Sequence, residues 1–265
     1  MNKNLLFEMS AASDAFEVSV AKSINSKYKN FGITAIRPPA DTSLPDVLVK
    51  VKNVGESFIE VKMSHSDNLA NPRVFFDGSE WKTTYKTPVA SEAIKMLNSS
   101  DQAKEFIESI KKATRKKIIT LPTTKSGLRD PNAVSLEQMY NFVEKRGSRY
   151  VAELSDIDVG RLATLHYTVG KSVPANYIQA GDDFYLLGNS DPLNLSELNL
   201  GRIPKLGGKG DFKVRISTRS QFYEIQIELK IKKFNPPSSP FSTLADTSKI
   251  NPFDAVVEML KTLKK

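Results

Sequence analysis

The stretch PDVLVKVKNVGESFIEVK, residues 45–62, determines the fold that we expect for this chain. In both of its halves apolar residues alternate with polar or charged ones, as in half-buried strands, and the alternation continues into the residue after the stretch: Val47, Val49, Val51, Ile59, Val61 and Met63. These residues share one face only if the connecting loop has an odd number of residues, because a shift by one residue turns every side chain over. The sequence therefore predicts a hairpin with the loop Asn53-Val54-Gly55, in which Gly55 is left-handed.

This register places Asp46 opposite Lys62 on the other face of the hairpin, with Glu60 beside them. Leu48 and Phe58 lie on the same face, which indicates that it is partly covered. Isolated ions on a covered face cost several kcal/mol, so these charges need partners. The hairpin thus brings two carboxylates and an ammonium to one end, where folding alone does not require them.

A divalent cation would supply such a partner. The carboxylates of Asp46 and Glu60, with the carbonyl oxygen of Val61, suit Mg²⁺, which takes few protein carboxylates and keeps water and phosphate oxygens as other ligands. Lys62 would orient the attacking water or help to deprotonate it. Such a site polarises a phosphoryl group and lowers the pKa of bound water. The alternative is an ordinary Glu60–Lys62 ion pair on a solvated strand, with Pro45-Asp46 an ordinary turn.

The elements around the hairpin follow the order α-β-β-β-α-β. Residues 12–29 repeat apolar side chains four apart and predict an amphipathic helix, with Glu17 beside its apolar stripe. Residues 32–39 predict a short strand that two prolines end. After the hairpin, residues 100–117 predict a second helix and residues 118–121 a strand.

The rest of the chain mixes helices and strands. Residues 135–147 have a capping box and a glycine stop, and residues 156–170 predict a further helix. Residues 177–188 predict a hairpin, and residues 213–234 predict two long strands. Prolines then interrupt the pattern, and residues 251–265 predict a terminal amphipathic helix.

Pro45-Asp46 followed by Glu60-Val61-Lys62 resembles the signature of the PD-(D/E)XK nuclease superfamily, which has a restriction-endonuclease-like fold. The resemblance covers about residues 12–122 and joins a short motif to the expected element order. It implies an α/β (α+β) fold with an α-β-β-β-α-β core around a mixed central sheet. A C-terminal α+β region would follow this core.

The resemblance implies Mg²⁺-dependent hydrolysis of phosphodiester bonds in DNA, with Mn²⁺ able to substitute, to leave 5′-phosphates. Asp46 and Glu60 would ligate the metal, and Lys62 would act on the water. Many members carry a Glu on the first helix, and Glu17 occupies the matching place, unless it is an ordinary helix glutamate. Exonucleases of the superfamily that act with recombination machinery place a Gln and then a Tyr after the motif. Residues 64–81 lack this pairing, which favours an endonuclease.

A second Glu-x-Lys pair competes with the first. Glu228 and Lys230 lie in QIELKIK, seventeen residues or more after Asp211. No apolar residue shares their face, which is typical of a one-sided, solvated or DNA-facing sheet. Asp211 follows Gly-Lys-Gly rather than opening a strand against them. We therefore expect the catalytic site at residues 45–62.

Basic residues are the candidate DNA contacts. The loop 201–213 is basic without lying at a helix end, and with the start of the next strand it supplies the preferred phosphate contacts: Lys205, Lys209, Lys213 and Arg215. Lys116 and Lys117, with the cluster at 145–149, are further candidates, although basic residues at helix ends also offset the helix dipole. His65 either contacts a substrate phosphate or is an ordinary loop histidine.

The composition sets limits on the function. The net charge of +8 favours nucleic acid or anionic membrane as a partner. No stretch approaches the length of about 18 apolar residues that a membrane helix needs, and the apolar run before Glu8 is too short for the core of a signal sequence. We therefore expect a cytoplasmic protein without a membrane partner. With no Cys and two His, Cys-based and His-rich metal sites are excluded, and carboxylates must hold any metal.

We expect a nuclease core at residues 1–125, a C-terminal α+β region at 126–250 that helps to hold DNA, and the terminal helix at 251–265. The expected partner is double-stranded DNA. Cutting both strands with one site per chain favours a homodimer. The alternative function is a non-catalytic nucleic-acid-binding or assembly protein that retains the nuclease fold.

Overall fold

The computed structural model describes residues 3–39, 44–65, 67–69, 73–76, 79–115, 145, 150–197, 203–219 and 222–231. The chain forms two compact units, each built from separated segments. The first unit consists of Met1–Asp67, Tyr167–Gly207 and Lys233–Lys265, and the second of Asn68–His166 and Gly208–Lys232. The expected divisions at residues 125 and 250 do not match these units, because strands far apart in the sequence pair within each unit.

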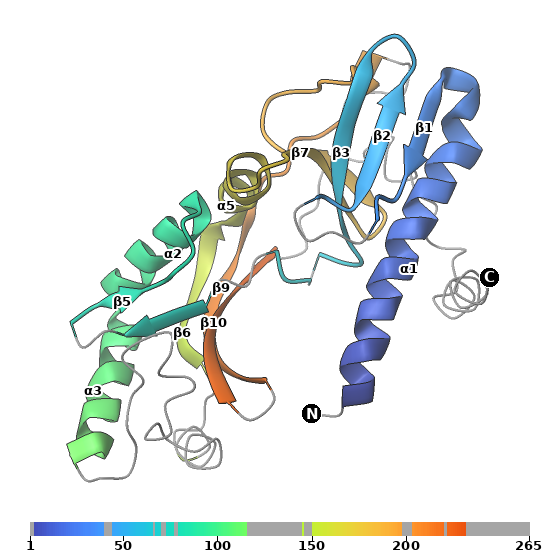
Figure 1. Cartoon of the computed structure of the whole chain (residues 1–265). Coiled ribbons are helices and arrows are strands. Elements are labelled where there is room, and N and C mark those ends of the chain that lie inside the picture. The colour runs from blue at the N-terminus through green and yellow to red at the C-terminus, as the bar shows by residue number, and fades with distance from the viewer. Residues whose placement is uncertain are drawn as a thin grey trace. The chain divides into compact units, whose positions relative to one another are not determined.

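The first unit is built on a five-stranded mixed sheet (Figure 1). Its strands in spatial order are β1 (Ile33–Ile36), β2 (Val47–Val51), β3 (Gly55–Lys62), β7 (Ala175–Ala180) and β8 (Asp183–Leu186). β1, β2 and β3 are antiparallel neighbours, β3 and β7 run parallel, and β7 and β8 form the predicted second hairpin. The mixed α/β class and the mixed sheet that the sequence predicts are confirmed.

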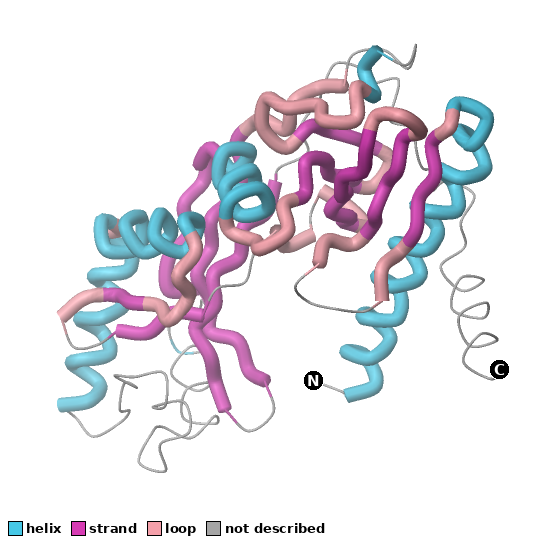
Figure 2. The backbone as a smooth tube through the Cα atoms, turned by 45° about the horizontal axis from the view of Figure 1, so that its top comes forward, coloured by secondary structure: helices cyan, strands magenta, loops and turns pink. Residues whose placement is uncertain are grey.

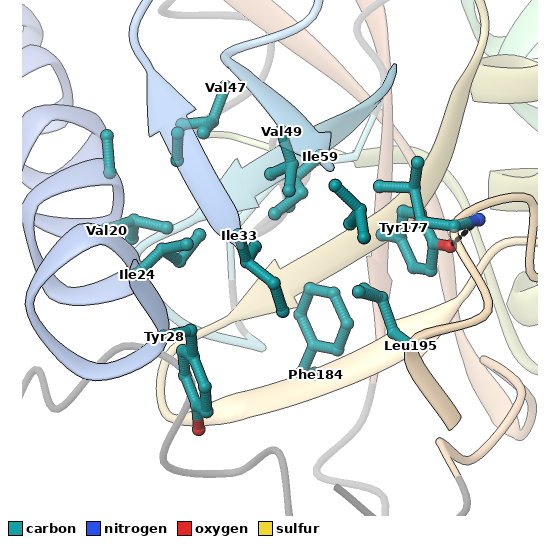
Figure 3. Close-up of a cluster of buried hydrophobic side chains, with 14 of the residues drawn as sticks. Val20, Ile24, Tyr28, Ile33, Val47, Val49, Ile59, Tyr177, Phe184 and Leu195 are labelled. Carbon is teal, nitrogen blue, oxygen red and sulfur yellow. Dashed lines mark hydrogen bonds between the residues drawn. The ribbon is translucent and has the colours of Figure 1, made fainter. Parts of the chain in front are cut away.

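Helix α1 (Lys3–Tyr28) covers one face of this sheet (Figure 3). It begins before the predicted residue 12, and it ends in a 3₁₀ turn, η1 (Lys29–Phe31), followed by Gly32 with a φ of 73°. The helix and the sheet bury a common core: Val20, Ile24, Ile33, Val47, Val49, Ile59, Val61, Tyr177 and Phe184. Burying such a side chain stabilises the fold by about 1.5–3 kcal/mol. The charged residues of the hairpin are left to the opposite face.

The loop of the first hairpin has three residues, as predicted, but it lies one residue earlier in the chain. β2 ends at Val51, which pairs with Gly55, so the loop is Lys52-Asn53-Val54. Asn53 takes the left-handed conformation, with a φ of 65°. Asn tolerates this conformation because its short polar side chain can hydrogen-bond locally. The prediction of Gly55 as the left-handed loop residue is therefore wrong.

This shift changes the register of the two strands by two positions. Val47 pairs with Ile59, so one step further Asp46 lies level with Glu60 rather than opposite Lys62. The predicted pairing of Asp46 with Lys62 is thus wrong. A shift of two residues preserves the face of every side chain, because the period of a strand is two. The charged residues therefore remain together on the face that the sequence predicts.

The second unit interrupts the predicted element order. The helix predicted at 100–117 forms as α3 (Asp101–Arg115), but it belongs to the second unit. The helix predicted at 156–170 forms as α5 (Val159–Thr164), which continues into a π-helical turn, η3 (Leu165–Val169), ahead of β7. The strand predicted at 118–121 and the helix at 251–265 lie outside the described residues, as does the helix at 135–147 except for residue 145.

The second unit is built on a five-stranded antiparallel sheet (Figure 2). Its strands in spatial order are β5 (Trp81–Lys82), β4 (Arg73–Phe76), β10 (Phe222–Ile231), β9 (Lys209–Arg219) and β6 (Tyr150–Asp158). β9 and β10 confirm the two predicted long strands. Helix α2 (Pro88–Ser99) precedes α3, whose Phe106 lies 6.4 Å from Trp81 between ring centroids.

No helix among the described residues is long and apolar enough to cross a membrane.

A side chain of α1 closes the outer edge of β1. Asn25 donates a hydrogen bond of 2.7 Å from Nδ2 to the carbonyl of Ala35, and its Oδ1 accepts one of 2.8 Å from the Ala35 N–H. β1 is an edge strand, and an edge otherwise presents unpaired backbone groups. This contact fixes α1 along β1 (Figure 1). Ala35 lies two residues before Arg37.

Candidate active site

The two halves of the motif meet through a backbone hydrogen bond. Asp46 directly precedes β2, and its Oδ2 accepts a hydrogen bond of 2.7 Å from the backbone N–H of Val61 in β3. Val61 is the middle residue of the Glu-Val-Lys motif. This hydrogen bond therefore joins Pro45-Asp46 to the Glu-Val-Lys motif. The sequence predicted which side chains share a face, but it did not predict this contact with the backbone.

Glu60 and Lys62 form a largely buried ion pair on β3. Lys62 Nζ lies 2.6 Å from Glu60 Oε1, and their side chains are only 19% and 7% exposed. Lys62 Nζ also lies 5.6 Å from the ring centroid of Tyr167, which is fully buried. Tyr167 belongs to η3, and π-helical turns are frequent at functional sites. The ammonium is thus held between a carboxylate and an aromatic ring.

Glu17 reaches the site from α1 and is held by Arg37. Arg37 Nε donates a hydrogen bond of 2.7 Å to Glu17 Oε2, and Arg37 Nη2 lies 2.7 Å from Asp14 Oδ1. Ser13 Oγ lies 3.4 Å from Glu17 Oε1. Because Arg37 directly follows β1, its guanidinium joins the helix to the end of that strand.

A cleft of about 390 Å³ brings these groups together. Prolines form part of its wall, and four carboxylates and two cations line it: Asp14, Glu17, Asp46, Glu60, Arg37 and Lys171. Its volume is within the range of small ligand sites, roughly 300–1,000 Å³. The predicted site residues Glu17, Asp46 and Glu60 therefore face one cavity, and Lys62 contacts it through Glu60.

The four carboxylates that line the cleft outnumber its two lining cations. Burial raises the pKa of Asp46 to about 7, and the nearby carboxylates of Glu60 and Glu17 act in the same direction, while Lys62 opposes them. Burial also raises the pKa of Glu17, although its hydrogen bond to Arg37 lowers it in part. A bound cation would relieve this excess of negative charge.

Lys62 keeps its charge in this setting. Burial disfavours the ammonium, but Tyr167, Glu60 and Asp46 outweigh that effect and raise the pKa of Lys62 well above its ordinary value. For the Tyr167 hydroxyl, in contrast, burial raises the pKa, so this group stays protonated. The site therefore presents a fixed ammonium at neutral pH.

The donor set suits a cation of the Mg²⁺ type. Mg²⁺ is usually bound through one or two carboxylates, and water and substrate phosphate oxygens complete its octahedron. Asp46 and Glu60 can supply the two carboxylates. Within the described ranges, no group of three or more His, Asp or Glu side chains is arranged to hold a metal by itself. Water and substrate would therefore have to supply the remaining ligands.

The sequence patterns did not reveal Arg37, Tyr167 or Lys171 as residues of this site. Arg37 could have been suspected, because it follows a short strand and α1 carries acidic residues on the facing side. Tyr167 and Lys171 had no such signal. The chain reaches them only after the long second-unit segment, so no local pattern connects them to the hairpin.

His65 lies three residues after Lys62 and is held by β8. Its Nε2 lies 3.0 Å from the Tyr185 hydroxyl and 3.3 Å from Asp183 Oδ2. This nitrogen is therefore engaged within the first unit, and a phosphate contact by His65 stays a prediction.

The competing Glu-x-Lys pair lies in the other unit. Asp211 lies within β9, and its Cα partner is Lys230 of β10, so the expectation that Asp211 does not face this pair from a strand is wrong. The side chains of Glu228 and Lys230 are outside the described part of the chain. Asp211 belongs to the second unit, whereas Asp46 belongs to the first.

The predicted basic loop is divided between the two units. Lys205 belongs to the first unit, where its Nζ lies 2.8 Å from Asn189 Oδ1. Lys209 begins β9 in the second unit and pairs with β6, so residues 209–213 belong to a strand and the prediction of a loop there is wrong.

Two of the predicted phosphate contacts, Lys213 and Arg215, lie further along β9. Lys213 Nζ lies 3.0 Å from Glu153 Oε1 and 5.0 Å from the ring centroid of Tyr150. Lys116 and Lys117 lie outside the described residues. DNA contact by any of these residues stays a prediction.

No protein-family model, curated protein or solved structure matches this chain. The motif, the topology of the first unit and the geometry of the cleft are therefore the observations on which a function can rest.

Proposed function

We propose that this chain is a Mg²⁺-dependent DNA endonuclease of the PD-(D/E)XK type, which hydrolyses phosphodiester bonds and leaves 5′-phosphate ends. The observation that carries this proposal is the hydrogen bond between Asp46 and Val61, which brings Asp46 to the Glu60–Lys62 ion pair. The topology of the first unit supports it. There α1 and the antiparallel strands β1, β2 and β3 are joined by β7, which follows a helical turn and runs parallel to β3.

The residues of the cleft have separate parts in this reaction. Asp46 and Glu60, with the carbonyl of Val61, would hold the cation. When bound, it would polarise the scissile phosphate and lower the pKa of a bound water. Lys62, held as an ammonium, would orient the attacking water and stabilise negative charge that develops on the phosphate, and it would not act as the base. Glu17 would hydrogen-bond to that water.

DNA binding is the second part of the proposal. We assign phosphate contacts to Lys205 in the first unit and to Lys209, Lys213 and Arg215 in the second. Phosphate contacts of this kind make binding weaken steeply as salt rises. Because each chain carries one site, cutting both strands of a duplex would use two copies of the chain.

Plasmid cleavage tests the function directly. We expect supercoiled plasmid to become nicked and then linear in Mg²⁺ or Mn²⁺ and to stay intact in EDTA. Cleaved ends should be joined by DNA ligase without prior treatment with a kinase, because they carry 5′-phosphates. Cleavage of a closed circle also separates an endonuclease from an exonuclease. Retarded but uncut DNA in every buffer would support the non-catalytic alternative, in which Glu60 and Lys62 form a structural ion pair.

The variant Tyr167→Phe tests how Lys62 is placed. Phe keeps the ring beneath the ammonium but removes the hydroxyl that hydrogen-bonds to Lys62. A hydrogen bond to a charged group is worth about 1.5–3 kcal/mol, and about 1.4 kcal/mol corresponds to a tenfold change in rate, so we expect kcat to fall by about tenfold. KM for DNA should change little, because the phosphate-binding residues are untouched. Tyr150→Phe is the matched control, since that ring lies 5.0 Å from Lys213 Nζ in the second unit. Unchanged kcat in Tyr167→Phe would remove Tyr167 from the site.

A further inference from the structure

Arg37 holds two of the four carboxylates that line the cleft. Its Nε and Nη2 lie 2.7 Å from Glu17 Oε2 and 2.7 Å from Asp14 Oδ1. A guanidinium has a rigid, planar fork of donors, so two such contacts fix both acceptors in position. The Arg37 and Glu17 side chains are only 23% and 11% exposed, which limits exchange with solvent. Arg37 is thus an internal cation of the site.

The backbone next to Arg37 is fixed as well. Asn25 binds both backbone groups of Ala35, two residues before Arg37. Asn25 and Glu17 are eight residues apart on α1, close to two helical turns, so they lie on the same side of the helix. Helix and strand are therefore joined at two points, and the guanidinium has little freedom to leave Glu17.

The remaining carboxylates of the cleft have different partners. Glu60 is paired with Lys62, and Asp46 accepts a hydrogen bond from a backbone N–H rather than from a cation. Charge is therefore least balanced at Asp46. Two-metal sites place their ions about 3.5–4 Å apart, and each ion needs carboxylate oxygens. Here each carboxylate on the α1 side of the cleft already shares one oxygen with Arg37, Oε2 of Glu17 and Oδ1 of Asp14.

We infer that Arg37 takes the place of a second metal ion, so that each chain binds one divalent cation, at Asp46 and Glu60, and Glu17 is held for the reaction without being a metal ligand. This inference rests on the proposed function. Arg37 is a positioning residue, because it acts through Glu17 and Asp14 and does not touch the reacting atoms.

Counting bound Mn²⁺ tests this inference without measuring cleavage. Free Mn²⁺ is titrated into the metal-free full-length protein and followed by electron paramagnetic resonance, with excess Mg²⁺ to displace it. Wild type should bind one Mn²⁺ per chain. Arg37→Gln should bind a second, weaker Mn²⁺, because two carboxylates lose their cation. Arg37→Lys should bind one, because it restores the charge. Lys50→Gln is the matched control, because it breaks the exposed Lys50–Glu56 pair in the hairpin that carries Glu60. This variant should also bind one Mn²⁺.

Two further variants locate the ions. Glu17→Gln alone should still bind one Mn²⁺, and Glu17→Gln combined with Arg37→Gln should lose the second. Two ions in wild type, or a single ion in a folded Arg37→Gln variant, would overturn the inference and leave the nuclease proposal standing. If Arg37→Gln does not fold, loss of the single ion in Glu17→Gln overturns it instead. No Mn²⁺ bound by wild type would overturn the proposed metal site and this inference together.

Discussion

Replacing Asp46 by Asn is expected to abolish Mg²⁺-dependent cleavage and at the same time to stabilise the metal-free protein at pH 8. Asn cannot supply a charged ligand, and loss of such an electrostatic contribution lowers rates by about 10³-fold or more. The hydrogen bond from the Val61 N–H should survive, because the side-chain carbonyl of Asn can accept it. The local fold of the hairpin is therefore preserved.

The gain in stability follows from the raised pKa of Asp46, about 7 in the folded chain against 3.8 for the free side chain. Between these values the folded state binds more protons than the unfolded state, so the free energy of unfolding falls as pH rises through this window. Each pKa unit corresponds to about 1.4 kcal/mol. Because Glu60 shares the effect, we expect Asn to recover about 2 kcal/mol at pH 8.

Urea unfolding of metal-free protein at pH 5 and pH 8 measures this effect. Wild type should lose stability between the two values, and Asp46→Asn should lose less. Added Mg²⁺ should raise the melting temperature of wild type at pH 8 and leave that of the variant nearly unchanged. Glu56→Gln is a control, because it removes an exposed carboxylate from the same hairpin. A variant that still cuts DNA, or that is less stable than wild type at pH 8, would contradict the account of Asp46.

The hairpin explains why its part of the fold could be predicted from the sequence. Alternation in Val47, Val49 and Val51 fixes which side chains are buried. Any register shift by an even number of residues keeps these side chains on the same face. The loop is less determined, because either Asn53 or Gly55 can take a left-handed conformation. The register was therefore wrong by two residues, yet the charged face was right.

The remaining errors come from pairing between distant segments. β7 pairs with β3 only after the chain has passed through the second unit. No local sequence pattern predicts that β7 is the parallel partner of β3. The same holds for Tyr167, whose contact with Lys62 depends on how η3 packs. Helix α3 was predicted correctly as a helix and assigned to the wrong unit, because periodicity identifies an element and not its neighbours.

Replacing Lys62 by Met is expected to abolish cleavage and to destabilise the metal-free protein, in contrast to Asp46→Asn. Met has similar length but no charge, so the Glu60 carboxylate, 7% exposed, is left without its cation. Removing one partner of a buried ion pair typically costs about 3–5 kcal/mol. Because Lys62 is 19% exposed, we expect a loss near the lower end of that range, about 3 kcal/mol. Cleavage should fall by about 10³-fold, as for other groups that stabilise developing charge.

Two comparisons separate the catalytic part of Lys62 from its structural part. Glu60→Gln combined with Lys62→Met should recover most of the lost stability in urea unfolding, because residue 60 no longer carries an unpaired buried charge. It should remain inactive on plasmid, because both functional groups are gone. Lys50→Met breaks the exposed pair with Glu56 and should cost less than about 1 kcal/mol without affecting cleavage. If Lys62→Met cuts plasmid at the wild-type rate, Glu60 and Lys62 form an ion pair that only stabilises the fold, and the reaction must be sought elsewhere.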